Sequence, residues 1–269
     1  MSQLTLMGVL AHPDDESLGM GGVLAKYAAE GVATRLVTAT RGERGRFFDD
    51  ANRPDGAEVG RVREAELRAA ASVLGVREVR VLGYHDGDLD LAEPREAVRR
   101  VAAELRRARP DVVVTFDPMG AYGHPDHIAI SQIASAAMVA AAAPGDGDSD
   151  DGGPPHRVAK LYFMAWDEAT WIRYQAAFKR LVSRVDGVER VASPWPHWAI
   201  TTRVDARAHW RTVWHAVRCH ETQLAIYGQL DRLGEDDHAA MWGLQTFYRA
   251  HSLVNGGRGV ETDLFAGLR

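Results

Sequence analysis

The sequence contains a single cysteine, Cys219, among its 269 residues. A lone cysteine excludes a disulfide within the chain, and it excludes a structural metal site built from pairs of cysteines. Any metal site must therefore use histidine and carboxylate ligands. We expect Cys219 to be a small, partly apolar packing residue rather than a nucleophile.

Long apolar runs and an excess of positive charge are also missing. The first apolar run, residues 4–10, is followed almost at once by His12 and is too short for a signal peptide or a membrane span. The net charge of -5 argues against general binding to nucleic acid or to an anionic membrane. We therefore expect a cytoplasmic protein whose partner is a small molecule, and a homo-oligomer remains open.

The composition, with 46% hydrophobic and 26% charged residues, is that of an ordinary globular protein. We expect one domain over residues 1–269, because a single α/β domain of this length can bury a full core. Residues 1–143 would form its core and residues 157–269 a C-terminal α/β portion that completes the substrate pocket. Residues 144–156 are rich in glycine, aspartate and proline and are expected to form a flexible insertion.

Short apolar segments alternate with amphipathic ones along the first half of the chain. The pattern predicts strands at 4–10, 33–40, 78–84 and 111–117, and helices at 17–30, 61–74 and 94–108. Further strands are predicted at 158–166 and 199–204, and further helices at 171–182 and 206–227. Repeated β-α units imply a Rossmann-like three-layer α/β fold with a mostly parallel sheet and a C-terminal extension.

Polar residues follow directly after four of the predicted strands: His12, Arg41, His85 and the segment 117–127. In open α/β sheets, ligands bind outside the carboxyl ends of the strands. We therefore expect these four loops to meet at one mouth. The loop 41–60 is long enough to have a functional role of its own.

The dipeptide His-Pro occurs twice, in His12-Pro13-Asp14-Asp15 and in His124-Pro125-Asp126-His127. Proline suits the first position of a helix, so each segment is predicted to open one. Two imidazoles and a carboxylate with open positions are typical of a catalytic zinc site, and Fe²⁺ or another divalent metal would accept a similar set. The alternative is that the acidic residues interact with helix dipoles and the histidines cap helices. The occurrence of two such segments favours the metal site.

The same residues carry a resemblance to a known family. Residues 11–16 and 122–127, supported by 40–43 and 83–87, resemble the LmbE-like, or PIG-L, N-acetylglucosaminyl deacetylases. The resemblance is good over residues 5–130 and weaker afterwards, where residues 219–223 match a late family element. It implies one Zn²⁺ per chain and hydrolysis of an N-acetyl amide on an N-acetylglucosamine-type sugar conjugate, which releases acetate and the free amine.

The resemblance also implies a role for each residue of the two segments. His12, Asp15 and His127 would be the metal ligands and Asp14 the general base. Tyr122 would help the metal to stabilise the oxyanion. His124, oriented by Asp126, would act as electrostatic stabiliser or general acid.

Four further residues are predicted to bind substrate. Asp86 matches a family carboxylate that binds sugar hydroxyls, with a turn residue as the alternative. Arg41 and Glu43 follow a predicted strand, and the alternative for them is a solvated charged loop. Gln223 lies in the late element, where a polar helix face is the alternative.

Three other functions stay open at this stage. The segment 19–22, Gly-Met-Gly-Gly, suggests a nucleotide-binding protein, although glycine is missing from the strand-to-helix turn where the dinucleotide motif needs it. A non-catalytic sugar-binding module would keep the fold without the chemistry. Finally, the metal could serve a different acyl group or amine, as in a glycopeptide or an antibiotic intermediate.

Overall fold

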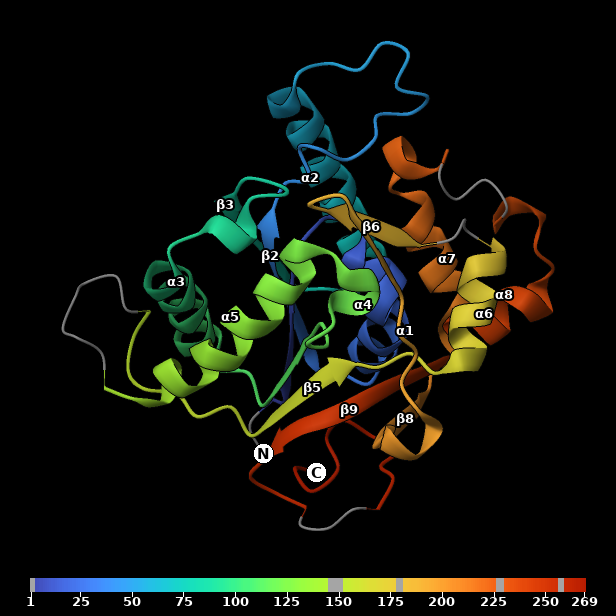
Figure 1. The fold of residues 1–269 in the computed structure, drawn as a ribbon. Helices are drawn as coiled ribbons and strands as arrows, with labels where there is room; N and C mark the ends of the chain where they lie inside the picture. The colour runs from blue at the N-terminus through green and yellow to red at the C-terminus, as the bar shows by residue number, and fades with distance from the viewer. Residues whose placement is uncertain (1–2, 145–151, 178–180, 226–229, 256–258) are drawn as a thin grey trace.

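The computed structural model describes residues 3–144, 152–177, 181–225, 230–255 and 259–269 (Figure 1). Its central sheet has the strand order β3-β2-β1-β4-β5-β9-β8. The strands are β1 (Thr5–Leu10), β2 (Ala33–Thr40), β3 (Glu78–Tyr84), β4 (Val112–Thr115), β5 (Lys160–Met164), β8 (Thr202–Asp205) and β9 (Leu244–Ser252). The first five are parallel, and β9 runs antiparallel to both of its neighbours. The mostly parallel sheet predicted from the sequence is confirmed.

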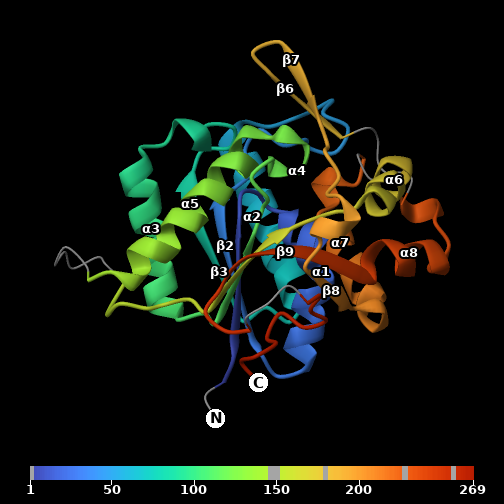
Figure 2. The same cartoon turned by 60° about the horizontal axis from the view of Figure 1, so that its bottom comes forward.

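Helices cover both faces of this sheet (Figures 1 and 2). They are α1 (Asp15–Ala29), α2 (Gly56–Val73), α3 (Pro94–Ala108), α4 (Gly120–Gly123), α5 (Pro125–Ala142), α6 (Glu168–Ala177), α7 (Trp210–Arg218) and α8 (Glu235–Trp242). Short 3₁₀ turns lie at Leu89–Leu91, His197–Ala199, Arg207–His209, Glu221–Gln223 and Leu230–Arg232. Helices α3 and α5 pack together on one face, while α1, α2 and α7 pack together on the other. The arrangement is the three-layer α/β fold expected from the alternating pattern.

The middle of the sheet forms the core. Every residue of β1 and β4 is buried, because helices cover both faces of these strands. Strands β2 and β3 and helix α3 have the bounds that the sequence predicted. None of the helices in the described ranges is long and apolar enough to cross a membrane.

The second half departs more from the predictions. The helix predicted at 206–227 ends at Arg218 and is followed by a 3₁₀ turn at Glu221–Gln223. Helix α8, strand β9 and the hairpin β6–β7 (Val182–Val185 and Val188–Val191) were not predicted at all. The hairpin extends away from the sheet (Figure 2). Much of the predicted insertion, residues 145–151, lies outside the described residues, as do residues 178–180 and 226–229.

The glycines of segment 19–22 allow helices to pack closely and do not form a phosphate-binding loop. A Cβ atom on Gly21 would lie 3.0 Å from Val213 Cγ1, and one on Gly22 would lie 2.9 Å from the Cβ of Ala206. Glycine is thus needed for α1 to approach the segment around α7. The strand-to-helix turn itself is formed by residues 11–14, which include no glycine. The glycine-rich loop that a dinucleotide-binding protein needs at this turn is therefore absent.

Candidate active site

The first His-Pro segment lies where β1 passes into α1. The prediction that Pro13 opens the helix is wrong, because α1 begins at Asp15 and Asp14 has a left-handed backbone with φ of 97°. The Asp14 N–H donates to Glu16 Oε2 at 3.0 Å, which stabilises this uncommon conformation. Asp15 Oδ2 accepts the His12 N–H at 2.8 Å, so the carboxylate folds back beneath the histidine.

The second segment opens α5 as the sequence predicted. Pro125 is the first helical residue and His124 is the N-cap, with its Nδ1 accepting the Asp126 N–H at 3.2 Å. His127 lies in the first turn and is buried. Its ring stacks on Phe116, with ring centroids 3.9 Å apart and planes inclined by 12°.

Three donor atoms from the two segments surround one point. His12 Nδ1 lies 3.2 Å from His127 Nε2, His127 Nε2 lies 3.5 Å from Asp15 Oδ1, and His12 Nδ1 lies 3.8 Å from Asp15 Oδ2. Ligands bound at zinc distances in a tetrahedron are about 3.4 Å apart, so the three residues fit one divalent cation. Burial raises the pKa of Asp15 to about 7 and lowers that of His127 well below its usual value.

Other donors surround His12. Three imidazoles, those of His12, His124 and His127, each offer a nitrogen within 4.8 Å of the others, and His12 forms a second group of this kind with Asp86 and Asp126. The second group decides the orientation of His12. Its Nε2 lies 3.0 Å from Asp86 Oδ1 and 3.1 Å from Asp126 Oδ2, which leaves Nδ1 directed at His127 and Asp15.

The structure corrects the role expected for Asp126. Its buried carboxylate contacts His12 and accepts the Gly87 N–H at 2.7 Å and the Leu89 N–H at 3.2 Å. Only its backbone N–H reaches the His124 side chain. Asp126 therefore orients His12, and helix capping rather than the Asp126 carboxylate fixes His124. Burial and the nearby charge of His12 lower the pKa of His124 to about 4.

The carboxylate of Asp14 meets an arginine that the sequence analysis did not identify. Arg63 Nη2 lies 3.1 Å from Asp14 Oδ2 and donates to the Pro13 carbonyl at 2.6 Å, while Nη1 donates to the Gly42 carbonyl at 2.9 Å. Arg63 is buried in the middle of α2. No motif surrounds it in the sequence, so only the packing of α2 against the first turn identifies it.

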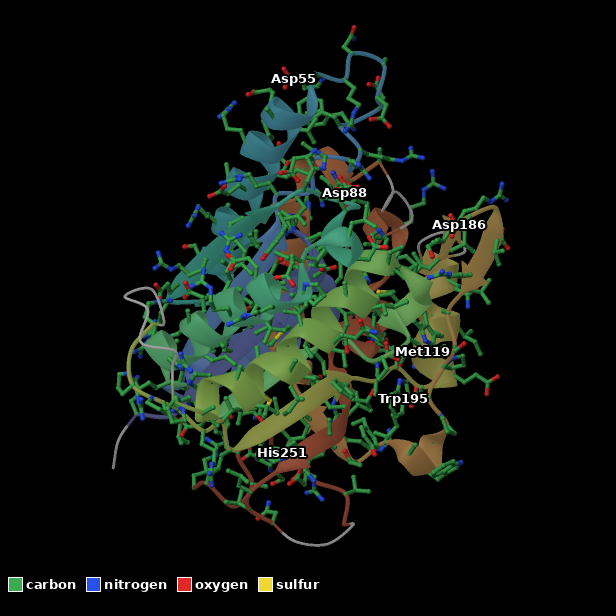
Figure 3. All side chains as sticks on the ribbon, turned by 60° about the vertical axis from the view of Figure 1, so that its left-hand side comes forward. Asp55, Asp88, Met119, Asp186, Trp195 and His251 are labelled. Atoms are coloured by element: carbon green, nitrogen blue, oxygen red, sulfur yellow. The ribbon has the colours of Figure 1, made fainter. Side chains whose placement is uncertain are left out.

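Tyr122 and His124 lie on a loop that is held from two sides. The Asp117 carboxylate accepts the Ala121 N–H and the Trp195 indole N–H, both at 2.8 Å. Figure 3 shows Trp195 beside this loop, close to the labelled Met119. From the hairpin, Ser183 Oγ donates to the Gly123 carbonyl at 2.8 Å. Burial raises the pKa of Tyr122 above its ordinary value, so its hydroxyl keeps its proton.

The four predicted substrate residues have different positions. Asp86 borders the cavity and accepts the Arg44 N–H at 2.9 Å. Glu43 lies behind it and accepts the Asp86 N–H at 3.3 Å. Arg41 is not in the site, because its Nε pairs with Glu64 at 2.7 Å in a separate groove between α2 and α3.

Gln223 does border the cavity, but its amide nitrogen is engaged elsewhere. It donates to the Arg46 carbonyl at 2.7 Å and to Thr222 Oγ1 at 2.9 Å. Phe48 N–H in turn donates to the Thr222 carbonyl at 2.9 Å. Thr222 and Gln223 therefore hold the loop that follows β2 in place, and Arg44 belongs to this loop.

A cavity of about 530 Å³ joins these residues, which is the size of a small-molecule site. Around His12, Asp15 and His127 it is lined by Asp14, Arg44, Arg63, Asp86, Tyr122 and His124. An apolar wall begins at Phe116, which stacks on His127, and is formed by Leu18, Phe116, Trp166, Trp171, Tyr174, Leu181 and Val182. The cavity thus combines a charged wall with an apolar one.

Comparisons with known proteins show which proteins this chain is similar to. Residues 7–138 match the family described as PIG-L: GlcNAc-PI de-N-acetylase. A 1D-myo-inositol 2-acetamido-2-deoxy-alpha-D-glucopyranoside deacetylase from Nocardiopsis dassonvillei is 36% identical over 97% of this chain and 100% of that protein. The conserved protein TT1542 from Thermus thermophilus superposes with a TM-score of 0.67 at 27% identity, over 94% of this chain and 98% of that one. The N,N'-diacetylchitobiose deacetylase from Pyrococcus horikoshii has the same fold, with a TM-score of 0.67 at 23% identity over 91% and 83% of the two chains.

Proposed function

Since the chain belongs to the PIG-L family of de-N-acetylases, which hydrolyse N-acetyl amide bonds, we propose that it deacetylates an N-acetylglucosamine-type sugar conjugate with a metal bound by His12, Asp15 and His127. The observation that carries the proposal is the triangle of donor atoms with edges of 3.2, 3.5 and 3.8 Å beside the Asp14 carboxylate. We propose Zn²⁺ as the metal, because two imidazoles and one carboxylate match its catalytic sites.

A divalent metal at this point supplies a Lewis acid that polarises the amide carbonyl and makes water more acidic. The protein has to supply the proton transfers. Asp14 is the base that we assign to the attacking water, because it borders the cavity next to Asp15. Arg63, at 3.1 Å from Asp14 Oδ2, orients this carboxylate.

The two residues of the 120–124 loop complete the assignment. The Tyr122 hydroxyl, which keeps its proton, donates a hydrogen bond to the oxyanion that develops on the carbonyl oxygen. The leaving nitrogen must be protonated before the C–N bond breaks, and Asp14 can return to it the proton taken from water. His124, whose lowered pKa favours the neutral ring, would act as an electrostatic stabiliser and donate a hydrogen bond through Nε2. Its ring lies 4.9 Å from that of His12, so it reaches the same end of the cavity as Asp86.

Asp86 and Arg44 form the charged wall that we assign to the sugar. A carboxylate and a guanidinium together can bind the vicinal hydroxyls of a pyranose ring, because one accepts and the other donates. Asp86 also contacts His12 Nε2 at 3.0 Å, so it links the sugar end of the cavity to the metal-binding residues. Glu43 supports this wall from behind through the Asp86 N–H.

The proposal is tested by metal analysis of the purified protein followed by measurement of amine release from a panel of N-acetylglucosamine conjugates. We expect one zinc per chain and hydrolysis that is abolished in Asp14→Ala while the metal is retained. A metal-free protein, or an Asp14→Ala variant as active as the wild type, would contradict it. Bound metal without hydrolysis of any conjugate would instead support a non-catalytic sugar-binding module.

A further inference from the structure

The two ends of the active-site cavity differ in chemistry, and the metal-binding residues lie between them. On the side of His12 stand Asp86, which contacts His12 Nε2, and Arg44. On the side of His127 stands Phe116, whose ring stacks on the histidine. The sugar-binding wall and the apolar wall therefore extend from opposite ligands of the same metal site.

The apolar wall is a continuous series of aromatic rings. Phe116 lies 6.5 Å from Trp166, Trp166 lies 5.6 Å from Trp171, and Trp171 lies 6.1 Å from Tyr174, measured between ring centroids. The series begins at the metal ligand His127 and runs outward to α6. Apolar side chains from two other segments complete the wall: Leu18 from α1, and the adjacent Leu181 and Val182.

The wall is held in place by the fold. Trp171 and Tyr174 are both buried, and the Tyr174 hydroxyl donates to the Leu18 carbonyl, which ties α6 to α1. A rigid aromatic wall beside open space binds apolar groups because little side-chain entropy is lost there. Simple core packing would explain buried rings, but it would not explain why they border the same cavity as Asp14 and His12.

The direction of the amide decides which part of the substrate meets this wall. The amine and acyl substituents leave the carbonyl carbon in opposite directions. With the sugar held by Asp86 and Arg44 and the carbonyl at the metal site, the acyl group extends past His127 toward Phe116 and Trp166. An acetyl methyl group reaches only the beginning of this wall.

We propose that Phe116, Trp166, Trp171, Tyr174 and Leu18 form an acyl subsite, and that the enzyme hydrolyses amino sugars whose N-acyl group is longer than acetyl. The inference rests on the proposed function, because it uses the same metal site and the same sugar wall. The reaction is hydrolysis throughout. Water adds to the carbonyl carbon, the C–N bond breaks, the acyl group leaves as a carboxylate, and the nitrogen takes both protons of the water and leaves as an ammonium group.

The test is a series of glucosamine derivatives that differ only in the acyl group, from N-acetyl through N-propionyl and N-butyryl to N-hexanoyl, with release of glucosamine as the readout. Burial of each added methylene should raise kcat/KM about fourfold until the subsite is full. A parallel series keeps the N-acetyl group and compares methyl with octyl glycosides. A rise only in this second series would overturn the inference and assign the apolar wall to the aglycone.

Two variants locate the effect. Trp171→Ala removes the middle of the wall and should lower the ratio of kcat/KM for N-hexanoyl to that for N-acetyl at least tenfold; Leu18→Trp fills the space and should lower the same ratio. Ile172→Ala, on the same helix but 61% exposed, is the matched control and should leave the ratio unchanged. An unchanged ratio in both wall variants, or a flat acyl series in the wild type, would overturn the inference. Absence of hydrolysis of the N-acetyl compound itself would instead contradict the proposed function.

Discussion

His220 Nε2 lies 2.8 Å from Glu16 Oε1, and both side chains are completely buried. Burial favours the neutral form of each group, but their mutual attraction prevails: the pKa of Glu16 is lowered and that of His220 is raised. The other Glu16 oxygen accepts the N–H of Asp14, the residue with the left-handed backbone. His220, from the C-terminal half of the chain, thus positions the Glu16 carboxylate, and Glu16 in turn stabilises the backbone of Asp14, the proposed base.

We predict that His220→Gln lowers kcat by about 10- to 100-fold with little change in KM, because a small displacement of the base weakens proton transfer more than binding. Steady-state kinetics on an N-acetylglucosamine conjugate measures this split. His215→Gln, an exposed histidine one helical turn earlier, is the control and should match the wild type. Thermal unfolding of each variant checks that the protein is folded at the assay temperature. A rise in KM at constant kcat would contradict a positioning role.

Tyr122→Phe is predicted to lower kcat by about 10²- to 10³-fold, which is the usual effect of removing one oxyanion donor. The ring contacts with His127 and His124 survive the substitution, so the metal content should stay the same. Metal analysis and kcat are measured on the same preparation. Tyr248→Phe removes a phenol outside the cavity and serves as the control. Loss of metal from Tyr122→Phe would mean that the hydroxyl has a structural role instead.

The layers of the fold, and the segments whose residues we propose as metal ligands, could be read from the sequence because both depend on local patterns. Strand β2 and helix α3 follow apolar periodicity, and the two His-Pro segments needed only their places after strands. The departures arise from contacts between distant residues. Arg63 and Asp14 are 49 residues apart in the sequence, and Asp126 and His12 are 114 residues apart, yet each pair is in contact. Nothing in the neighbouring sequence records such contacts.

The arginines at positions 41 and 44 give a matched test of the substrate wall. Both guanidinium groups form an ion pair, Arg44 with Asp88 at 2.8 Å and Arg41 with Glu64 at 2.7 Å. Only Arg44 borders the cavity, where its backbone N–H also donates to Asp86. We predict that Arg44→Ala raises KM for the sugar conjugate about tenfold, since one charge-assisted hydrogen bond is lost. Arg41→Ala should leave KM within about twofold, because an exposed ion pair contributes little. Equal effects of the two substitutions would contradict the assignment of the wall.

Measurements of metal content should distinguish the role of Asp14, the proposed base, from that of Asp15, the proposed metal ligand. Dialysis against a chelator is predicted to abolish hydrolysis, and added Zn²⁺ should restore it. Asp15→Asn should lower the metal content strongly, because this carboxylate is one corner of the donor triangle. Asp14→Asn should keep one metal per chain while kcat falls about 10³-fold. The assignment would be reversed if Asp14→Asn lost the metal and Asp15→Asn kept it.

Far from the active site, Glu261 joins the C-terminal segment to the sheet. Its buried carboxylate accepts hydrogen bonds from Lys160 Nζ at 2.7 Å, Tyr162 Oη at 2.6 Å and Thr202 Oγ1 at 3.1 Å, and it lies 2.7 Å from Arg249 Nη1. Burial alone would raise the pKa of Glu261, but these partners lower it from 4.5 to about 2. The folded state therefore binds a proton less readily here than the unfolded chain.

This shift predicts how the free energy of unfolding depends on pH. Because the folded pKa is the lower one, the contribution of Glu261 is fully present above pH 4.5 and is lost as the pH falls toward 2. It amounts to at most about 3 kcal/mol, at about 1.4 kcal/mol per pKa unit. Urea unfolding at pH 7, 4.5 and 3 should show a smaller acid-induced loss of stability in Glu261→Gln than in the wild type.

Glu261→Gln should also be less stable than the wild type at pH 7, by about 3–5 kcal/mol, because Lys160 stays buried without its charged partner. The double variant Glu261→Gln/Lys160→Met removes both charges and should recover part of this loss. Glu235→Gln, whose side chain is 73% exposed and pairs with Arg211, is the control and should change stability by less than about 1 kcal/mol. An acid-induced loss in Glu261→Gln equal to that of the wild type would show that Glu261 does not set the acid limit of this fold.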